Sequence, residues 1–319
     1  MRLVAGALLW GAAGLLVVLW TGAPRSAPAD GGSRDAAPPL RVMSFNIRYG
    51  SAADGENAWP QRREMVVETI LRFDPDLLGL QECLAEQADD LQAALSGYAF
   101  FGAGRDDGQR AGEMCAILYR RARFEELAGG HFWLSETPSR PGSRGWDAAC
   151  PRMVSWVRLA ERGRAAGGAL CFLNTHFDHR GSRARREAAL LLRERLGDLC
   201  GSCAVIVTGD FNAPADAGES APYRILLGEV GSRAERAPRD ARAPRVLRPL
   251  IDTYRALHPL APGEGTYHGF RGERFGARID WILATPDLHP LEAAIVSRGQ
   301  AGRYPSDHFP VTAVLHRVR

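Results

Sequence analysis

Apolar residues after position 40 alternate between short strand-like runs and longer helical patterns. Arg41–Ile47 and Leu77–Leu80 are brief apolar runs that are typical of buried strands. Between them, from Asn57 or Ala58 to Phe73, the apolar residues recur at helical spacing, and Pro60 suits the first turn of a helix. Three further helices are predicted over Ala85–Leu95, Ser182–Leu199 and Pro222–Leu227.

The remaining apolar runs predict a series of additional strands. They cover Tyr98–Gly102, Met114–Arg120, Phe124–Phe132, Val154–Leu159, Ala169–Thr175, Ala204–Thr208, Ile279–Ala284, Leu291–Val296 and Val311–Leu315. This order mixes strand–helix units with consecutive strands, which excludes a simple parallel doubly wound sheet. It favours an α/β fold in which two sheets pack together with helices outside. We find no internal sequence repeat.

The first forty residues have a different character. Residues 3–20 carry no charge and follow Arg2, and a segment rich in Pro, Ala, Gly and Ser comes next. We predict a signal peptide or signal anchor over 1–23, a linker over 24–39 and one domain over 40–319. Ala27-Pro28-Ala29 offers a cleavage site, so secretion, a periplasmic location and a membrane anchor through residues 3–20 all stay open.

Composition narrows the chemistry. The 319-residue chain contains no Lys, so its 40 basic residues are all Arg, which excludes Schiff-base and P-loop lysine mechanisms. A formal charge of +3 is too balanced to indicate nucleic-acid binding by itself. Six Cys are too few for a disulfide framework. We predict Cys83, Cys115 and Cys171 to be small buried residues, and Cys200 and Cys203 to form a local disulfide in an oxidising compartment.

Between 233 and 248, Arg recurs at every third position among several Pro residues. That period matches one face of a polyproline helix. A basic ridge that binds phosphate and a solvated loop of biased composition are both consistent with it, and composition favours the loop.

Polar residues follow several of the predicted strands. They are Asn46, Glu82, Asp210 and Asn212, and Asp307 and His308 precede the last predicted strand. Ligands and catalytic groups gather beyond the ends of buried strands, so we expect these side chains to converge. Carboxylate and amide oxygens suit Mg²⁺ or Mn²⁺, and no Cys/His set suits zinc.

Six motifs in order resemble the endonuclease/exonuclease/phosphatase family of metal-dependent phosphoesterases. They are SFNIRYG, LGLQE, LNTHFDH, VTGDFNA, RIDWIL and SDHFPV, and the resemblance covers residues 41–319. It implies a four-layer α/β/β/α sandwich of two mixed sheets with outer helices. It also implies hydrolysis of a phosphoester by an activated water.

The resemblance carries roles over to matching residues. It implies that Glu82 is the principal ligand of Mg²⁺ (or Mn²⁺), with Asn46 and Asp307 beside it. Asp210 would activate the water, Asn212 would hold the water or the phosphoryl oxygens, and Asp280 would orient His308 against the growing charge. His176 would lie across the phosphate with Glu113 as its partner. Arg152, Arg105 and His179 are the expected substrate contacts.

The loops that select the substrate depart from deoxyribonuclease, which carries an Arg where this chain has Leu84. Loop residues resemble those of an exported bacterial subgroup, and Trp59, Trp146, Arg105, Asp106 and Tyr304 are candidates to line the pocket or, for the Trp residues, to pack in the core. We expect a small phosphoester, a lipid head group or nucleic acid as substrate, and a monomeric enzyme. The alternatives are an extracellular nuclease on duplex DNA and a non-catalytic binding module on the same fold.

Overall fold

The computed structural model describes residues 38–163, 168–216, 218, 220–229, 249–260 and 262–318. The predicted signal segment 1–23, the predicted linker 24–39 up to residue 37, and the arginine repeat of 233–248 lie outside these residues. No helix in the described part is both long enough and apolar enough to cross a membrane.

Two strand–helix–strand units form the centre of the fold. In the first, β1 (Leu40–Asn46) leads through α1 (Trp59–Phe73) to β2 (Leu77–Cys83), which pairs parallel with β1. In the second, β7 (Leu170–His176) leads through α3 (Ser182–Cys200) to β8 (Ala204–Asp210), again parallel. Each unit supplies the central pair of a six-stranded sheet.

The other strands extend both sheets in antiparallel fashion. One sheet has the order β11-β12-β1-β2-β4-β3 and the other β5-β6-β7-β8-β10-β9. Their bounds are β3 (Tyr98–Phe101), β4 (Met114–Arg120), β5 (Phe124–Trp133), β6 (Met153–Glu161), β9 (Ile251–Asp252), β10 (Asp280–Ala284), β11 (Leu288–Ile295) and β12 (Val311–Arg317). The two sheets therefore repeat one topology, although the sequence shows no repeat.

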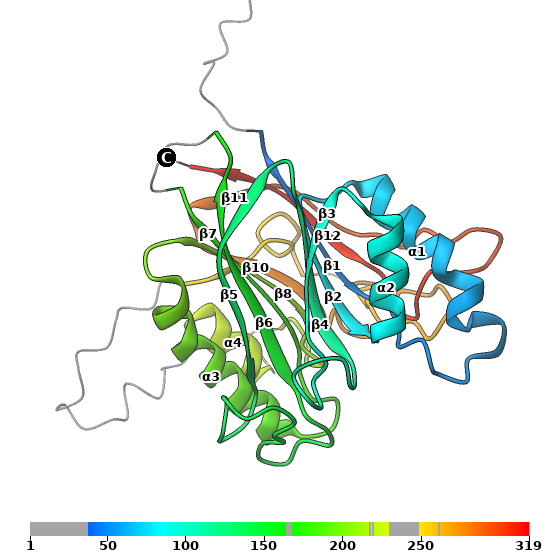
Figure 1. The fold of residues 1–319 in the computed structure, drawn as a ribbon, viewed down its shortest axis with the longest axis horizontal. Helices are drawn as coiled ribbons and strands as arrows, with labels where there is room; N and C mark the ends of the chain where they lie inside the picture. The colour runs from blue at the N-terminus through cyan, green and yellow to red at the C-terminus, as the bar shows by residue number, and fades with distance from the viewer. Residues whose placement is uncertain are drawn as a thin grey trace, which may run out of the picture. The chain divides into compact units, whose positions relative to one another are not determined.

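The layers form the predicted α/β/β/α sandwich (Figure 1). The sheets face each other through a core that includes Val42, Phe172 and Ile282. α1 and α2 (Ala85–Ala94) cover the outer face of the first sheet. α3 and α4 (Ala221–Leu227) cover the second. A short 3₁₀ turn, η1 (Gly55–Asn57), precedes α1.

A polar layer interrupts the core between the sheets. Asn174 of β7 donates to the backbone oxygens of Leu80 (2.7 Å) and Ala116 (2.8 Å) across the interface. Its Oδ1 accepts from the side chains of Gln81 (2.6 Å) and Thr208 (3.1 Å). Every one of these side chains is fully buried, so the bonds fix how the two sheets meet.

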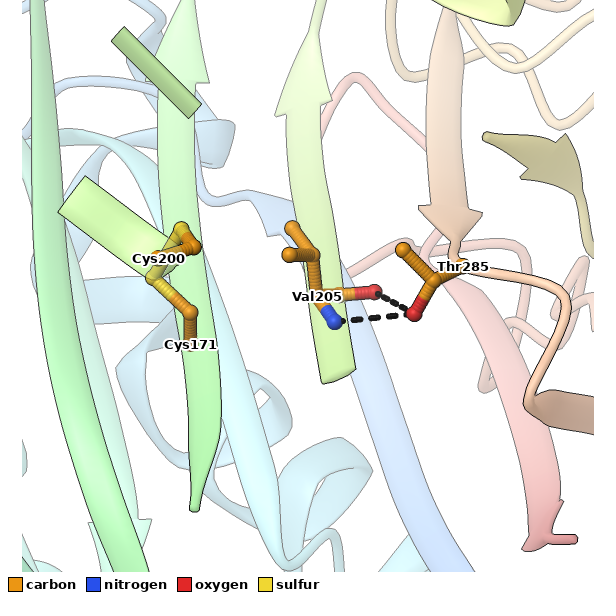
Figure 2. Close-up of a disulfide and its surroundings, with 4 residues drawn as sticks. All are labelled: Cys171, Cys200, Val205 and Thr285. Atoms are coloured by element: carbon orange, nitrogen blue, oxygen red, sulfur yellow. Dashed lines mark hydrogen bonds between the residues drawn. A yellow bond between two sulfur atoms is a disulfide. The ribbon is translucent and has the colours of Figure 1, made fainter. Parts of the chain in front are cut away.

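The cysteine prediction was wrong in its pairing. Cys200, the last residue of α3, is bonded to Cys171 of β7, with their Cα atoms 5.5 Å apart, and Cys203 is free (Figure 2). Both bonded residues belong to the core between α3 and the second sheet, whereas Cys203 follows a turn and leads into β8. Cys83 and Cys115 are buried free cysteines, as predicted.

Nearby, Val205 of β8 donates from its backbone to the Thr285 hydroxyl at 2.9 Å (Figure 2). The disulfide joins the end of α3 to β7, and the Val205–Thr285 bond joins the start of β8 to the residue that follows β10.

Candidate functional site

The topology brings the motif residues to one end of both sheets. Asn46, His176 and Asp210 are the last residues of β1, β7 and β8, and Glu82 is the penultimate residue of β2. The strands that flank these pairs run antiparallel, so they begin at the same end. They bring five more of the predicted residues there: Glu113, Arg152, Asp280, Asp307 and His308.

An imidazole held by a carboxylate forms the deepest part of the site. His308 Nδ1 lies 2.9 Å from Asp280 Oδ2, and its Nε2 lies 3.8 Å from Asp210 Oδ2. The three residues are at least 95% buried. Burial favours the neutral imidazole, but Asp280 and then Asp210 outweigh it and raise the pKa of His308 well above its ordinary value. The two carboxylates therefore favour the charged form of the buried His308 ring.

Asp210 stands between the two imidazoles of the site. Its Oδ2 accepts from Asn46 Nδ2 at 3.0 Å and lies 3.4 Å from His176 Nε2. Burial, and after it the nearby charge of Asp280, raise the pKa of Asp210 to about 7. A carboxylate with such a pKa is suited to accepting a proton from water near neutral pH.

His176 has the opposite electrostatic setting. Its Nε2 lies 3.1 Å from Asn212 Nδ2, and its Nδ1 lies 3.8 Å from Glu113. Burial, followed by the charges of Arg152 and Arg105, holds the pKa of His176 well below its usual value. The surroundings thus favour the charged form of one imidazole, His308, and the neutral form of the other, His176.

Asn46, Glu82 and Asp307 form the predicted metal side. Asn46 Nδ2 donates to Glu82 Oε1 at 3.0 Å, and the Tyr49 amide donates to Glu82 Oε2 at 3.1 Å. Burial raises the pKa of Asp307, and the negative charge of Glu82 raises it further. Asn46 Oδ1 accepts from the Arg48 amide at 3.0 Å, and the carboxylates of Glu82 and Asp307 are the hard oxygen donors that a divalent cation prefers.

Two groups of side chains at the site each offer three ligand atoms that lie within 4.8 Å of one another. One group is Glu82, Glu113 and His176, and the other is Asp210, Asp280 and His308. Glu82 belongs to the first group, and Asn46 links it to Asp210 of the second group by donating to both carboxylates at 3.0 Å.

The three predicted substrate contacts have different surroundings. Arg152 is 95% buried, its Nη2 lies 2.9 Å from His179 Nδ1, and its Nη1 has no hydrogen-bond partner among the described residues. Arg105 instead forms a two-bond ion pair with Glu113, at 2.6 and 2.7 Å. Arg152 Nε also lies 3.5 Å from Asp178 Oδ2, and Arg152, like Arg105, keeps a guanidinium nitrogen without a hydrogen-bond partner among the described residues.

Sequence reasoning passed over several residues around this centre. Arg48 pairs with Asp54 at 2.9 Å and lies 3.9 Å from Asp307. The Tyr267 ring is half exposed, 5.1 Å from the His308 ring. Arg62 of α1 is buried next to the ends of β1 and the loop before β12. Of the expected pocket residues, Trp59 is buried against Asp90 at 2.8 Å and so packs in the core.

A family model described as Endonuclease/Exonuclease/phosphatase family matches residues 43–308. The chain belongs to this family. An endonuclease/exonuclease/phosphatase structure from Bacteroides vulgatus is 32% identical, covers 88% of this chain and 100% of that chain, and has a TM-score of 0.75. A mannosyl-6-phosphatase of Bacteroides thetaiotaomicron is 33% identical, covers 86% and 99%, and has a TM-score of 0.72.

Among curated proteins, Nocturnin of Drosophila melanogaster is 26% identical over 89% of this chain and 47% of its own length. This chain spans less than half of the length of the curated relatives that it matches. Family membership confirms the predicted fold and identifies the chain as one of a family of phosphoester hydrolases.

Proposed function

We propose that the protein is a divalent-metal-dependent phosphatase that hydrolyses a small phosphoester. The observation that carries this proposal is the buried His308–Asp280 pair, 2.9 Å apart, beside the carboxylate of Asp210 and the free donor of Arg152. A binding module has no need for a buried imidazolium next to a carboxylate with a pKa of about 7.

Each residue has a distinct task in the proposed reaction. Asp210 accepts the proton of the attacking water, and Asn212, held by the Phe177 carbonyl at 3.0 Å, orients that water or a phosphoryl oxygen. The His308 imidazolium and Arg152 donate to phosphoryl oxygens as negative charge grows. A divalent cation, Mg²⁺ or Mn²⁺, bound by Asn46, Glu82 and Asp307 would neutralise phosphate charge.

The charges around the centre favour a compact substrate. Arg105 is paired with Glu113, Arg48 with Asp54 and Arg152 with Asp178, so none of these three cations is without a carboxylate partner. Duplex-DNA binding instead relies on many phosphate contacts. The similarity to a mannosyl-6-phosphatase over nearly its whole length supports a sugar phosphate as the substrate class.

The test is an initial-rate panel on residues 38–319 with Mg²⁺, Mn²⁺ or a chelator. It compares mannose 6-phosphate, glycerol phosphate, a bis-nitrophenyl phosphate, short single-stranded DNA and supercoiled plasmid. We expect the sugar phosphate to be fastest and chelation to abolish its hydrolysis. Glu82→Gln keeps the size of the side chain but removes its charge, and should cost ~10²-fold or more in rate.

If supercoiled plasmid is cleaved fastest, the proposed function is wrong and the protein is a duplex nuclease. Hydrolysis of none of the five substrates, with or without metal, would favour the non-catalytic module. Full activity after chelation would overturn the metal requirement.

We also propose that the protein acts outside the cytoplasm, as a secreted or periplasmic enzyme or one anchored through residues 3–20. The uncharged segment supports export. The Cys171–Cys200 disulfide supports it independently, because such bonds persist in oxidising compartments.

A further inference from the structure

Arg62 is a charged residue in a position that the helix pattern assigns to the core. α1 buries Trp59, Val66 and Ile70 on one face, and Arg62 lies on that face with 1% of its surface exposed. A buried guanidinium is costly unless its donors are satisfied. No carboxylate among the described residues lies within ion-pair distance of it.

The guanidinium instead donates to backbone carbonyls of three separate segments. Nε donates to Asn57 at 2.9 Å, Nη2 donates to Arg48 at 2.6 Å, and Nη1 donates both to Ile47 and, at 3.1 Å, to Pro305. These segments are the turn before α1, the loop after β1 and the loop before β12.

Two of these segments carry metal-side residues. Ile47 directly follows Asn46, and Pro305 comes two residues before Asp307. The β1–β12 ladder ends at the Ser44–Val311 pair, so sheet bonding does not join the segments that hold Asn46 and Asp307. Arg62 joins them, and the Ser306 hydroxyl adds one bond to the Asn46 carbonyl at 2.7 Å.

We infer that Arg62 is a positioning residue that sets the spacing between Asn46 and Asp307 for a divalent cation. The inference rests on the proposed metal-dependent function. The planar fork of Arg reaches carbonyls in several directions at once, which the single ammonium of Lys cannot do. Partners that orient metal ligands in this way typically change metal affinity by about 10- to 100-fold when they are replaced.

Charge and geometry make opposite contributions, and this decides the choice of variant. Removing the positive charge of Arg62 would by itself strengthen the binding of a divalent metal ion to Asp307 and Glu82, because it removes a repulsion between like charges. Arg62→Lys keeps the positive charge and removes the fork, so it isolates the geometric effect. Arg62→Met removes both, and Arg193→Lys is the matched control, because Arg193 is a buried arginine of α3 that donates to the Leu226 carbonyl.

The experiment titrates Mn²⁺ and Mg²⁺ into each folded protein by calorimetry without substrate, and then measures activity against metal concentration. We expect Arg62→Lys to bind metal about 10-fold or more weakly, and to recover most of its kcat at saturating metal. Arg193→Lys should keep the wild-type metal affinity even if its melting temperature changes. If Arg62→Met does not fold, Arg62→Lys alone decides.

Metal affinity of Arg62→Lys within 2-fold of wild type would overturn the inference and leave the proposed function intact. A kcat that stays low at saturating metal would also overturn it, because a spacing defect should be relieved once metal is bound. Wild-type protein that binds neither cation would contradict the proposed metal dependence itself.

Discussion

At the scale of single residues, the site depends on His308 and Asp280 acting as one unit. Asp280 Oδ2 lies 2.9 Å from His308 Nδ1, so it fixes both the charge and the orientation of the ring. We predict that His308→Ala lowers kcat by ~10²- to 10³-fold with little change in KM, and that Asp280→Asn causes part of this loss.

The double variant should be no slower than His308→Ala, because residues that act together are not additive. His289→Ala, on an exposed position of β11, is the control. Multiplied losses in the double variant would show that the two residues act separately.

The raised pKa of Asp210 predicts how the rate depends on pH. A general base works only when deprotonated, so its contribution is present above its pKa and is lost as the pH falls through that value. With the pKa of Asp210 at about 7, kcat/KM should rise between pH 6 and 8 and be half-maximal near 7. A pH–rate profile at saturating metal tests this. A half-maximal kcat/KM near pH 4, the ordinary pKa of an aspartate, would show that the rise is not set by an Asp210 with a raised pKa.

Most of the polar centre is predictable from sequence, and Arg62 shows where such prediction ends. His176 and Asp210 end a strand and His308 precedes one, each within a short motif, so order and chemistry together identify them. Arg62 has no such motif, and an arginine in a helix pattern reads as a solvent-facing residue. Its role depends on Ile47 and Pro305, which are 15 and 243 residues away and meet only in the folded chain.

At the scale of elements, one glycine sets how closely the two sheets approach. A Cβ on Gly79 of β2 would lie 2.1 Å from Thr208 Oγ1 and 2.6 Å from Asn174 Oδ1, in the polar layer behind the site. We predict that Gly79→Ala destabilises the fold by about 1–3 kcal/mol through overpacking, and lowers activity as well. Denaturant unfolding measures the first effect.

Gly97→Ala is the matched control, because a Cβ there meets nothing within 4 Å. Equal stability of the two variants would show that the sheets adjust to the extra atom without cost.

The sequence predicts the elements in which apolar residues recur at a regular spacing. The amphipathic helices and the long apolar strands were predicted and are confirmed, with small shifts at their ends. β9, two residues long, has no period to detect. The prediction paired Cys200 with Cys203 because the two are close in sequence. Cys171, the true partner of Cys200, is close to it only where β7 packs against α3.

At the scale of the whole molecule, the site results from two copies of one topology facing each other. Each sheet places a parallel pair at its centre, and the carboxyl ends of both pairs meet at one edge. The metal side comes from the first sheet and the Asp210–His176 side from the second, so the 3.0 Å bond from Asn46 to Asp210 joins the two halves. Neither sheet alone contains the complete centre.

The uncharged N-terminal segment and the disulfide together predict that this molecule folds outside the cytoplasm. A fusion of residues 1–40 to a reporter should export the reporter, and full-length protein should carry the Cys171–Cys200 bond in non-reducing mass mapping. The same chain without residues 1–37, made in a reducing cytoplasm, should contain both thiols. The bond closes a loop with a sequence separation of 29, so Cys171→Ala/Cys200→Ala should lose about 3–4 kcal/mol by the chain-entropy model. Cytoplasmic retention of the reporter, together with a reduced full-length protein, would overturn the extracytoplasmic location.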